Sequence, residues 1–86
     1  MKLNIEIYSK GYCPFCKRTK ATLKTLGLPF KEFDITSDAE KAKEMRSRSG
    51  RRTVPQVFIN GKHIGGSDEF HHALDNGLLK ELSPAL

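Results

Sequence analysis

Two cysteines separated by two residues, Cys13 and Cys16, lie where the hydrophobic pattern changes from that of a strand to that of a helix. Residues 3 to 8 alternate apolar and polar side chains, and a period of two is typical of a half-buried strand. After the cysteines the period becomes helical, and Gly27 is expected to end the helix. Cys13 is then the N-cap of this helix and Cys16 lies in its first turn. The residues expected on its buried face are Phe15, Thr19, Leu23 and Leu26.

The predicted helix start gives the two thiols different chemistry. Pro14 suits the first helical position, because its fixed φ is helical and its missing N–H would have no intrahelical partner. The free N–H groups of a first turn and the helix dipole favour thiolate over thiol, and such settings lower a cysteine pKa from about 8.5 to about 3.5–7.5. We therefore predict that Cys13 is the nucleophile and that Cys16 is a less exposed resolving thiol. The cations that can add to the effect are Lys10, Lys17 and Arg18.

Structural roles for the cysteine pair fit its spacing less well. A bridge that closes so short a loop constrains the unfolded chain by only about 2 kcal/mol in the chain-entropy model. A zinc site needs further ligands, and the chain offers no second cysteine pair, while His71 and His72 are adjacent and His63 stands alone. We therefore expect a redox dithiol without a bound metal, and we expect the histidines at the surface.

Length and composition predict one small domain that spans residues 1–86. The chain has 86 residues, of which 37% are hydrophobic, which is enough for a single core. No apolar run approaches the roughly 18 residues of a membrane span, and the N-terminus lacks the long apolar stretch of a signal peptide. Cysteines of cytosolic proteins are more often catalytic than structural. We expect a cytoplasmic monomer that binds no membrane.

The formal net charge of +5 raises the question of a nucleic-acid partner. The positive side chains are spread from Lys2 to Lys80 and interleaved with acids, which argues against a nucleic-acid surface. Solvated helix faces explain most of them, and a small anionic thiol substrate is the alternative for those near the cysteines. A second basic group consists of Arg46, Arg48, Arg51 and Arg52.

The segment after Gly27 predicts a strand and a second helix. Residues 30–35 have the pattern of a strand. The helix is expected to begin at Ser37, which has capping-box spacing to Glu40, and to end at Gly50. The strand residues expected to be buried are Phe30, Phe33 and Ile35.

A hairpin and a third helix complete the pattern. Residues 57–59 and 62–64 predict antiparallel strands around an Asn-Gly turn. Ser67 is expected to cap the third helix, and residues 77–82 predict a last short helix. The resulting order is β-α-β-α-β-β-α. The apolar residues of the third helix are Phe70, Ala73 and Leu74.

Three segments form a set of motifs in a fixed order. They are residues 10–16 (KGYCPFC), 53–59 (TVPQVFI) and 64–68 (IGGSD). With the order of elements, they make nearly the whole chain resemble the glutaredoxins, most of all the small bacterial dithiol type. The resemblance implies an α/β thioredoxin fold, with a four-stranded mixed sheet flanked by helices. One departure is Phe15, where the usual motif has Tyr, so the ring is kept and the hydroxyl is lost.

The resemblance also implies a site for glutathione, used as a co-substrate. Val54 would offer its backbone N–H and C=O to the cysteinyl part, and Pro55 would follow a cis peptide bond. Ser67 and Asp68 would hold the γ-glutamyl end, where helix-start N–H groups accept a carboxylate and the aspartate pairs with the ammonium group. The implied glutathione-binding residues are Lys10, Phe15, Arg52, Thr53, Val54, Pro55, Gly66, Ser67 and Asp68.

Several of these assignments have a plainer alternative. Lys10 and Arg52 are assigned to the glycyl carboxylate, but the neighbouring Arg51 could serve in place of Arg52. Pro55 could be a trans proline at the start of an edge strand. The Ser67-Asp68 pair could simply cap the third helix.

The implied activity is a glutathione-dependent reduction of protein–glutathione mixed disulfides and protein disulfides through Cys13 and Cys16. Three alternatives stay open. A thioredoxin-like reductase recharged by a flavoprotein more often has Trp where this chain has Tyr12. An iron–sulfur carrier would join two chains through Cys13 and two glutathiones, which Pro14 disfavours by family analogy. The third alternative is a structural domain with an inert dithiol.

Overall fold

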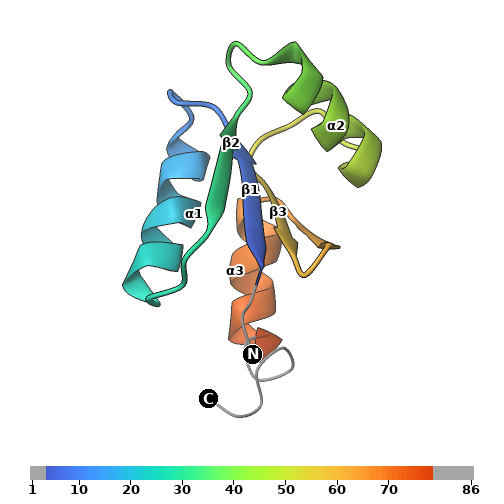
Figure 1. Cartoon of the computed structure of the whole chain (residues 1–86). Coiled ribbons are helices and arrows are strands. Elements are labelled where there is room, and N and C mark those ends of the chain that lie inside the picture. The colour runs from blue at the N-terminus through green and yellow to red at the C-terminus, as the bar shows by residue number, and fades with distance from the viewer. Residues whose placement is uncertain (1–3, 79–86) are drawn as a thin grey trace.

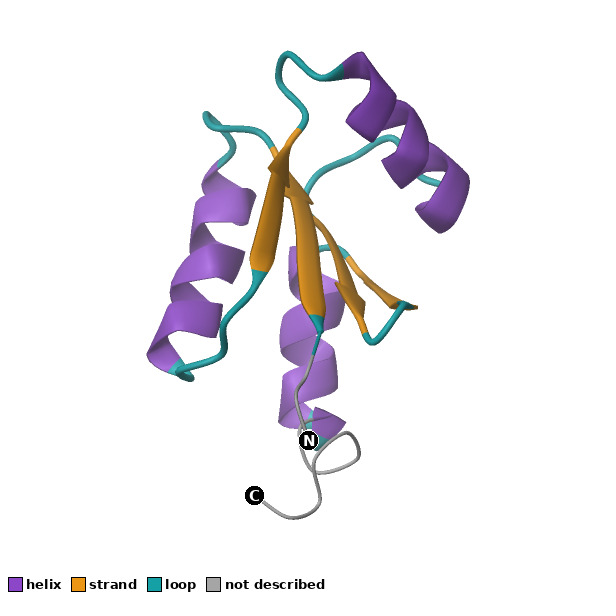
Figure 2. Ribbon diagram, in the orientation of Figure 1, coloured by secondary structure: helices purple, strands orange, loops and turns teal. Residues whose placement is uncertain are grey.

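The computed structural model describes residues 4–78, which form one sheet with helices packed against both faces (Figures 1 and 2). The order of elements is the predicted one. None of the helices within residues 4–78 is long and apolar enough to cross a membrane. In chain order the elements are β1 (Ile5–Ser9), α1 (Pro14–Thr25), β2 (Lys31–Asp34), α2 (Ala39–Ser49), β3 (Gln56–Ile59), β4 (Lys62–Gly65) and α3 (Ser67–Asp75).

The sheet is mixed and four-stranded, as predicted, with the strand order β2-β1-β3-β4. β1 pairs parallel with β2 and antiparallel with β3, and β3 pairs antiparallel with β4. The parallel pair needs a crossover connection, and α1 supplies it. The turn between β3 and β4 has positive φ angles at Asn60 (53°) and Gly61 (82°), as a tight Asn-Gly hairpin requires.

Different helices bury the two faces of the sheet. One hydrophobic cluster joins Ile7 of β1 to Leu23 of α1 and Phe70 of α3. The other joins Phe58 of β3 to Met45 of α2. Figure 2 shows α1 and α2 on opposite sides of the strands. The central strands therefore have no face open to solvent.

β1 is buried on both faces, so the prediction of a half-buried strand was wrong. Tyr8 and Ser9 are as fully buried as Ile7. β1 lies between two other strands, and α2 covers the face to which Tyr8 belongs. Leu3, the first residue of the predicted strand, lies outside the described residues.

α1 begins where the sequence predicts, with Cys13 as its N-cap in extended conformation (φ −83°, ψ 116°). Its buried face includes the predicted Thr19 and Leu23. Phe15 and Leu26 are 57% and 43% exposed, so their predicted burial was wrong. They lie at the two ends of the helix, in its first turn and at its C-cap, away from the core residues near its middle.

Two helix starts differ from the prediction by one residue. α2 is capped by Asp38 instead of Ser37, and the Asp38 carboxylate accepts a first-turn backbone N–H at 3.0 Å. α3 is capped by Gly66, which makes Ser67 its first helical residue. Asp, Ser and Gly all occur at N-caps, so the sequence does not separate such neighbours. The predicted end of α2 at Gly50 is confirmed by a left-handed φ of 71°.

Two further predicted elements, the second strand and the last helix, do not match the described structure over their full length. β2 is shorter than the predicted strand over 30–35, and Ile35 just beyond it is buried. Phe30 and Phe33 are only half-buried, because β2 is an edge strand. Most of the helix predicted for 77–82 lies outside the described residues, which end at residue 78.

Candidate active site

Cys13 and Cys16 lie together at the N-terminal end of α1. The Cys13 Sγ accepts a hydrogen bond from the backbone N–H of Cys16 at 3.3 Å, so the sulfur itself caps the helix. The Cys13 thiol also points to the carbonyl oxygen of Val54 at 3.8 Å. Cys13 is 8% exposed and Cys16 is 0% exposed, which confirms that Cys16 is the less accessible thiol.

Burial makes the two thiols chemically distinct. It raises the pKa of Cys16 to about 12, and the interaction of the Cys16 thiol with the Cys13 side chain acts in the same direction. Cys16 is therefore a neutral thiol at physiological pH. The Cys13 sulfur instead lies at the positive end of the α1 dipole. This arrangement can supply one attacking thiol and one that reacts only after the first has formed a disulfide.

A pocket of about 220 Å³ lies between the loop before β3 and the start of α3. Lys10 and Arg52 are not among the residues that line it. Arg52 instead lines a separate hollow beside α2, together with Arg46. The structure thus brings most of the implied glutathione set to one place and leaves those two residues outside it. The implied residues that line the pocket are Phe15, Thr53, Val54, Pro55, Gly66, Ser67 and Asp68.

The two walls of this pocket present backbone groups and small side chains. The Val54–Pro55 peptide bond is cis, as the resemblance implies. On the opposite wall, Ser67 and the exposed Asp68 open the first turn of α3. A Cβ atom on Gly66 would lie 3.4 Å from the Pro55 carbonyl oxygen, so the two walls come close together at Gly66.

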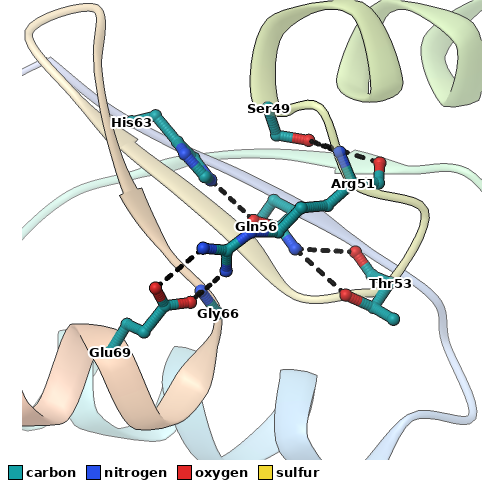
Figure 3. A network of polar contacts seen from close by, with 7 residues as sticks. All are labelled: Ser49, Arg51, Thr53, Gln56, His63, Gly66 and Glu69. Carbon is teal, nitrogen blue, oxygen red and sulfur yellow. Dashed lines mark hydrogen bonds and ion pairs between the residues drawn. The ribbon is translucent and has the colours of Figure 1, made fainter.

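An ion pair forms part of the pocket wall. The guanidinium group of Arg51 binds both carboxylate oxygens of Glu69, one of them at 2.8 Å (Figure 3). Glu69 also accepts the backbone N–H of Gly66 at 3.0 Å. The bond from Arg51, followed by that from Gly66, lowers the pKa of Glu69 to about 2. Gly65 permits this packing, since a Cβ atom there would come within 2.6 Å of the Glu69 carboxyl group.

A buried amide lies beneath the loop that forms the other wall. Gln56 is fully buried, and its Nε2 donates to the carbonyl oxygen of Thr53 at 3.0 Å and to its hydroxyl oxygen at 3.2 Å (Figure 3). The Gln56 Oε1 lies 2.7 Å from Nε2 of His63. Burial lowers the pKa of His63, and the charge of Arg51 acts in the same direction. The loop is therefore tied to both β3 and β4.

Sequence reasoning did not assign Gln56 or Glu69 to the site, and it named Arg51 only as a substitute for Arg52. The signal for Glu69 was its spacing of three residues from Gly66, which is that of a capping box. The signal for Gln56 was weaker, a polar residue at the start of an apolar strand. Its partners became visible only in the folded chain.

The predicted surface position of the histidines was wrong for His63 and His71, which are half-buried, and right for His72. The Nε2 of His71 lies 2.8 Å from the Thr22 hydroxyl, and its Nδ1 lies 2.7 Å from the Ser67 carbonyl oxygen. His71 thereby connects α1 to the start of α3. Within residues 4–78, no three potential metal-ligating side chains come together.

The fold and the site define a class of protein. A dithiol at the start of the first helix, facing the loop with the cis proline, is the arrangement of a thiol–disulfide oxidoreductase of the thioredoxin fold. A model of the glutaredoxin family matches residues 5–64. The chain belongs to the glutaredoxin family and is a glutathione-dependent thiol–disulfide oxidoreductase.

Individual relatives agree with this family. Glutaredoxin 3 of Escherichia coli K12 is 53% identical over 72 residues, which cover 84% of this chain and 86% of the relative. The solution structure of a glutaredoxin from Brucella melitensis is 42% identical, with a TM-score of 0.78 over 92% of this chain and 86% of that one. A buckwheat glutaredoxin crystallised as a glutathione complex is 32% identical, with a TM-score of 0.82 over 92% of this chain and 74% of that one. These likenesses confirm the predicted thioredoxin fold.

Proposed function

We propose that Cys13 is the nucleophile with which this glutaredoxin reduces protein–glutathione mixed disulfides and protein disulfides, and that Cys16 is its resolving thiol. The observation that carries the proposal is the position of the Cys13 Sγ. It lies at the start of α1 and 3.8 Å from the carbonyl oxygen of Val54, a residue of the pocket. Cys16 lies behind it, fully buried and neutral.

Glutathione occupies the pocket in this proposal, with its sulfur toward Cys13. The backbone of Val54 pairs with the cysteinyl part like one rung of a sheet. The first-turn N–H groups at Ser67 accept the γ-glutamyl carboxylate, and Asp68 pairs with the ammonium group. The exposed ring of Phe15 covers one side of the pocket. The glutathione complex of the similar buckwheat protein supports a ligand of this kind.

The glycyl carboxylate of glutathione is the end of the ligand for which more than one cation is a candidate partner. Lys10 and Arg52 match the family positions, but of the two neighbouring arginines it is Arg51 that lines the pocket. We therefore favour Arg51 for this contact. The ligand carboxylate would then share or replace the bond that Arg51 makes to Glu69.

Removal of glutathione from a protein needs only Cys13. Its thiolate attacks the glutathione sulfur of the mixed disulfide, and the protein leaves as a thiolate that takes up a proton. A second glutathione, as thiolate, attacks the glutathione sulfur bound to Cys13 and releases oxidised glutathione and the Cys13 thiolate. The two electrons that reduce the substrate come from glutathione.

Reduction of a protein disulfide needs both thiols. Cys13 attacks one substrate sulfur, Cys16 loses its proton and attacks the Cys13 sulfur, and the substrate leaves as a dithiol. Two glutathiones then reduce the Cys13–Cys16 disulfide. The direction is favourable, since glutaredoxins lie at about −200 to −230 mV and cytosolic glutathione at about −220 to −260 mV or lower.

The proposed partners are glutathione and proteins that carry glutathione or disulfides. The proposed setting is the reducing cytoplasm, where reduced glutathione is available, and the proposed active form is a monomer that binds neither nucleic acid nor membrane. The thioredoxin-like reductase and the iron–sulfur carrier are not favoured, because the matching family model and similar proteins such as glutaredoxin 3 of Escherichia coli are glutaredoxins.

The decisive experiment is deglutathionylation of a test peptide with reduced glutathione as the only electron donor, coupled to glutathione reductase. We expect turnover that depends on Cys13. No turnover with glutathione, and activity only with a thioredoxin reductase, would move the protein to the thioredoxin-like class. Ser67 and Asp68 would then be no more than the start of a helix.

A further inference from the structure

The loop that carries Thr53, Val54 and Pro55 has no regular secondary structure of its own. Side chains hold it at both ends (Figure 3). At its start, the Ser49 hydroxyl accepts the backbone N–H of Arg51 at 3.0 Å. At its end, the amide of Gln56 donates to both oxygens of Thr53. Val54 lies between these two sets of hydrogen bonds, so its position depends on how rigidly Ser49 and Gln56 are themselves held in place.

The orientation of the Gln56 amide is determined by its neighbours. Thr53 presents two oxygens, of which the carbonyl can only accept, so the amide NH₂ must face Thr53. The amide oxygen then faces His63, and His63 must donate from Nε2 across the 2.7 Å contact. The opposite orientation would bring two acceptors together at the Thr53 carbonyl. The Thr53 carbonyl therefore fixes the orientation of the amide, and the donor on β4 completes its hydrogen bonds.

His63 is itself held in place. Its ring packs on Phe58, with the ring centroids 5.0 Å apart and the planes at 38°. Burial and Arg51 lower the pKa of His63, while Glu69 opposes the change. The ring is therefore neutral at physiological pH and carries one proton, which the hydrogen bond to Gln56 places on Nε2.

We propose that Gln56 and His63 are positioning residues for glutathione, acting as a relay from β4 through the buried amide to the Thr53–Val54 backbone. This inference rests on the proposed function, because it concerns the same pocket. Neither side chain needs to touch the reacting sulfurs. Their part is to hold the Val54 backbone groups in the orientation that pairs with the ligand and that faces Cys13.

The kinetic test compares His63→Phe with His63→Gln. The first keeps a ring on Phe58 but removes the donor, and the second keeps an N–H donor for Gln56. We expect His63→Phe to raise the KM for glutathione about tenfold, equivalent to about 1.4 kcal/mol, with kcat changed much less. His63→Gln should restore most of the affinity. His72→Phe is the matched control, an exposed histidine outside the relay, and should leave both parameters unchanged.

A spectroscopic test reads the relay directly. Long-range ¹H–¹⁵N spectra of the reduced protein at neutral pH should show His63 as the Nε2–H tautomer. In Gln56→Glu, the carboxylate can still accept from His63 but cannot donate to Thr53, so the backbone signals of Thr53 and Val54 should shift. An Nδ1–H tautomer, or an unchanged KM in a folded His63→Phe, would overturn the proposal.

The two proposals fail in different ways. If the wild-type protein shows no turnover with glutathione, the proposed function fails while the tautomer and the backbone shifts still report on the relay. If the wild type turns over and His63→Phe has the same KM as His72→Phe, the relay has no role in binding and only the further inference fails.

Discussion

One buried polar network lies beneath the pocket loop, and another lies beneath α2. In the first, Gln56 ties Thr53 to His63. In the second, the fully buried Tyr8 donates its hydroxyl to Glu44 at 2.7 Å and accepts from Arg48 at 2.8 Å. Both networks consist of hydrogen bonds made by a buried polar side chain, but one holds a loop and the other holds a helix.

The difference lies in what each network holds. Tyr8 and Arg48 fasten a regular helix to the sheet, and Arg48 also lies 4.0 Å from the Phe58 ring centroid. A helix keeps its own backbone hydrogen bonds when such an anchor is lost. The loop held by Gln56 has no such internal order, so its anchor sets its shape. We therefore expect the α2 network to affect stability and the pocket network to affect binding.

The largest effect should come from the pocket side, in Cys13→Ser. Serine can still cap α1, so the fold should persist while the attacking thiolate is removed. We expect both glutathione-dependent activities to fall at least about a thousandfold. Coupled turnover assays with thermal unfolding as a control measure this. Appreciable turnover in a folded variant would assign the chemistry to another group.

The next effect separates the two thiols at the same helix start. Cys16→Ser should abolish reduction of protein disulfides, because no resolving thiol remains, and keep deglutathionylation within about twofold of the wild type. Parallel assays on a glutathionylated peptide and on a disulfide-bonded protein measure the two activities. Equal loss of both would show that Cys16 does more than resolve.

The α2 side should respond in stability alone. Tyr8→Phe removes a buried hydroxyl with two partners, and we expect the free energy of unfolding to fall by about 1 kcal/mol. Turnover should not change. Urea unfolding measures the loss, and Tyr12→Phe, the same change at a tyrosine that is 69% exposed, is the control. A raised KM in Tyr8→Phe would remove the contrast between the two networks.

The smallest effect concerns the ion pair in the pocket wall. The pKa of Glu69 is about 2 in the folded protein and about 4.3 in an unfolded chain. The lowered pKa stabilises the folded protein at pH values above the pKa of the unfolded chain. This contribution is lost as the pH falls toward 2. The contribution should be small, because the side chains of Arg51 and Glu69 are 42% and 47% exposed and solvent screens their charges.

Acid titration of unfolding should show a slightly flatter decline in Glu69→Gln than in the wild type between about pH 5 and pH 2. Glu40→Gln is the control, since Glu40 is also an exposed glutamate in a first helical turn. Identical acid profiles for Glu69→Gln and the wild type would show that the pair adds nothing to stability.

The predictions from sequence succeeded where a short pattern carried the information. The change of period at Cys13 placed α1 and its cap, and the Asn-Gly turn placed the hairpin. They failed where burial depends on distant segments. Tyr8 reads as one end of an alternating strand, and only the packing of α2 on that face explains its burial.

The site shows the same limit. The motifs predicted that Val54, Ser67 and Asp68 lie at one site, and all three line the same pocket, because each motif forms a turn or a helix start next to the sheet. Arg51 and Arg52 are adjacent in the chain, and only the folded loop shows which of them faces Glu69. Gln56 is polar in an apolar strand, and its use depends on residues of a loop and of another strand.

The sulfur of Cys13 caps α1, so a change in the chemical state of this sulfur changes a hydrogen bond in the first turn of the helix. A thiolate accepts the Cys16 N–H more strongly than a disulfide sulfur does, because a charged acceptor makes the stronger hydrogen bond. In the proposed mechanism, we therefore expect each catalytic cycle to loosen the first turn of α1 and to tighten it again. The exchange rate of the Cys16 amide proton should therefore report the redox state of Cys13. This proton should exchange with solvent more slowly in the reduced protein than in the protein whose Cys13 carries glutathione as a mixed disulfide.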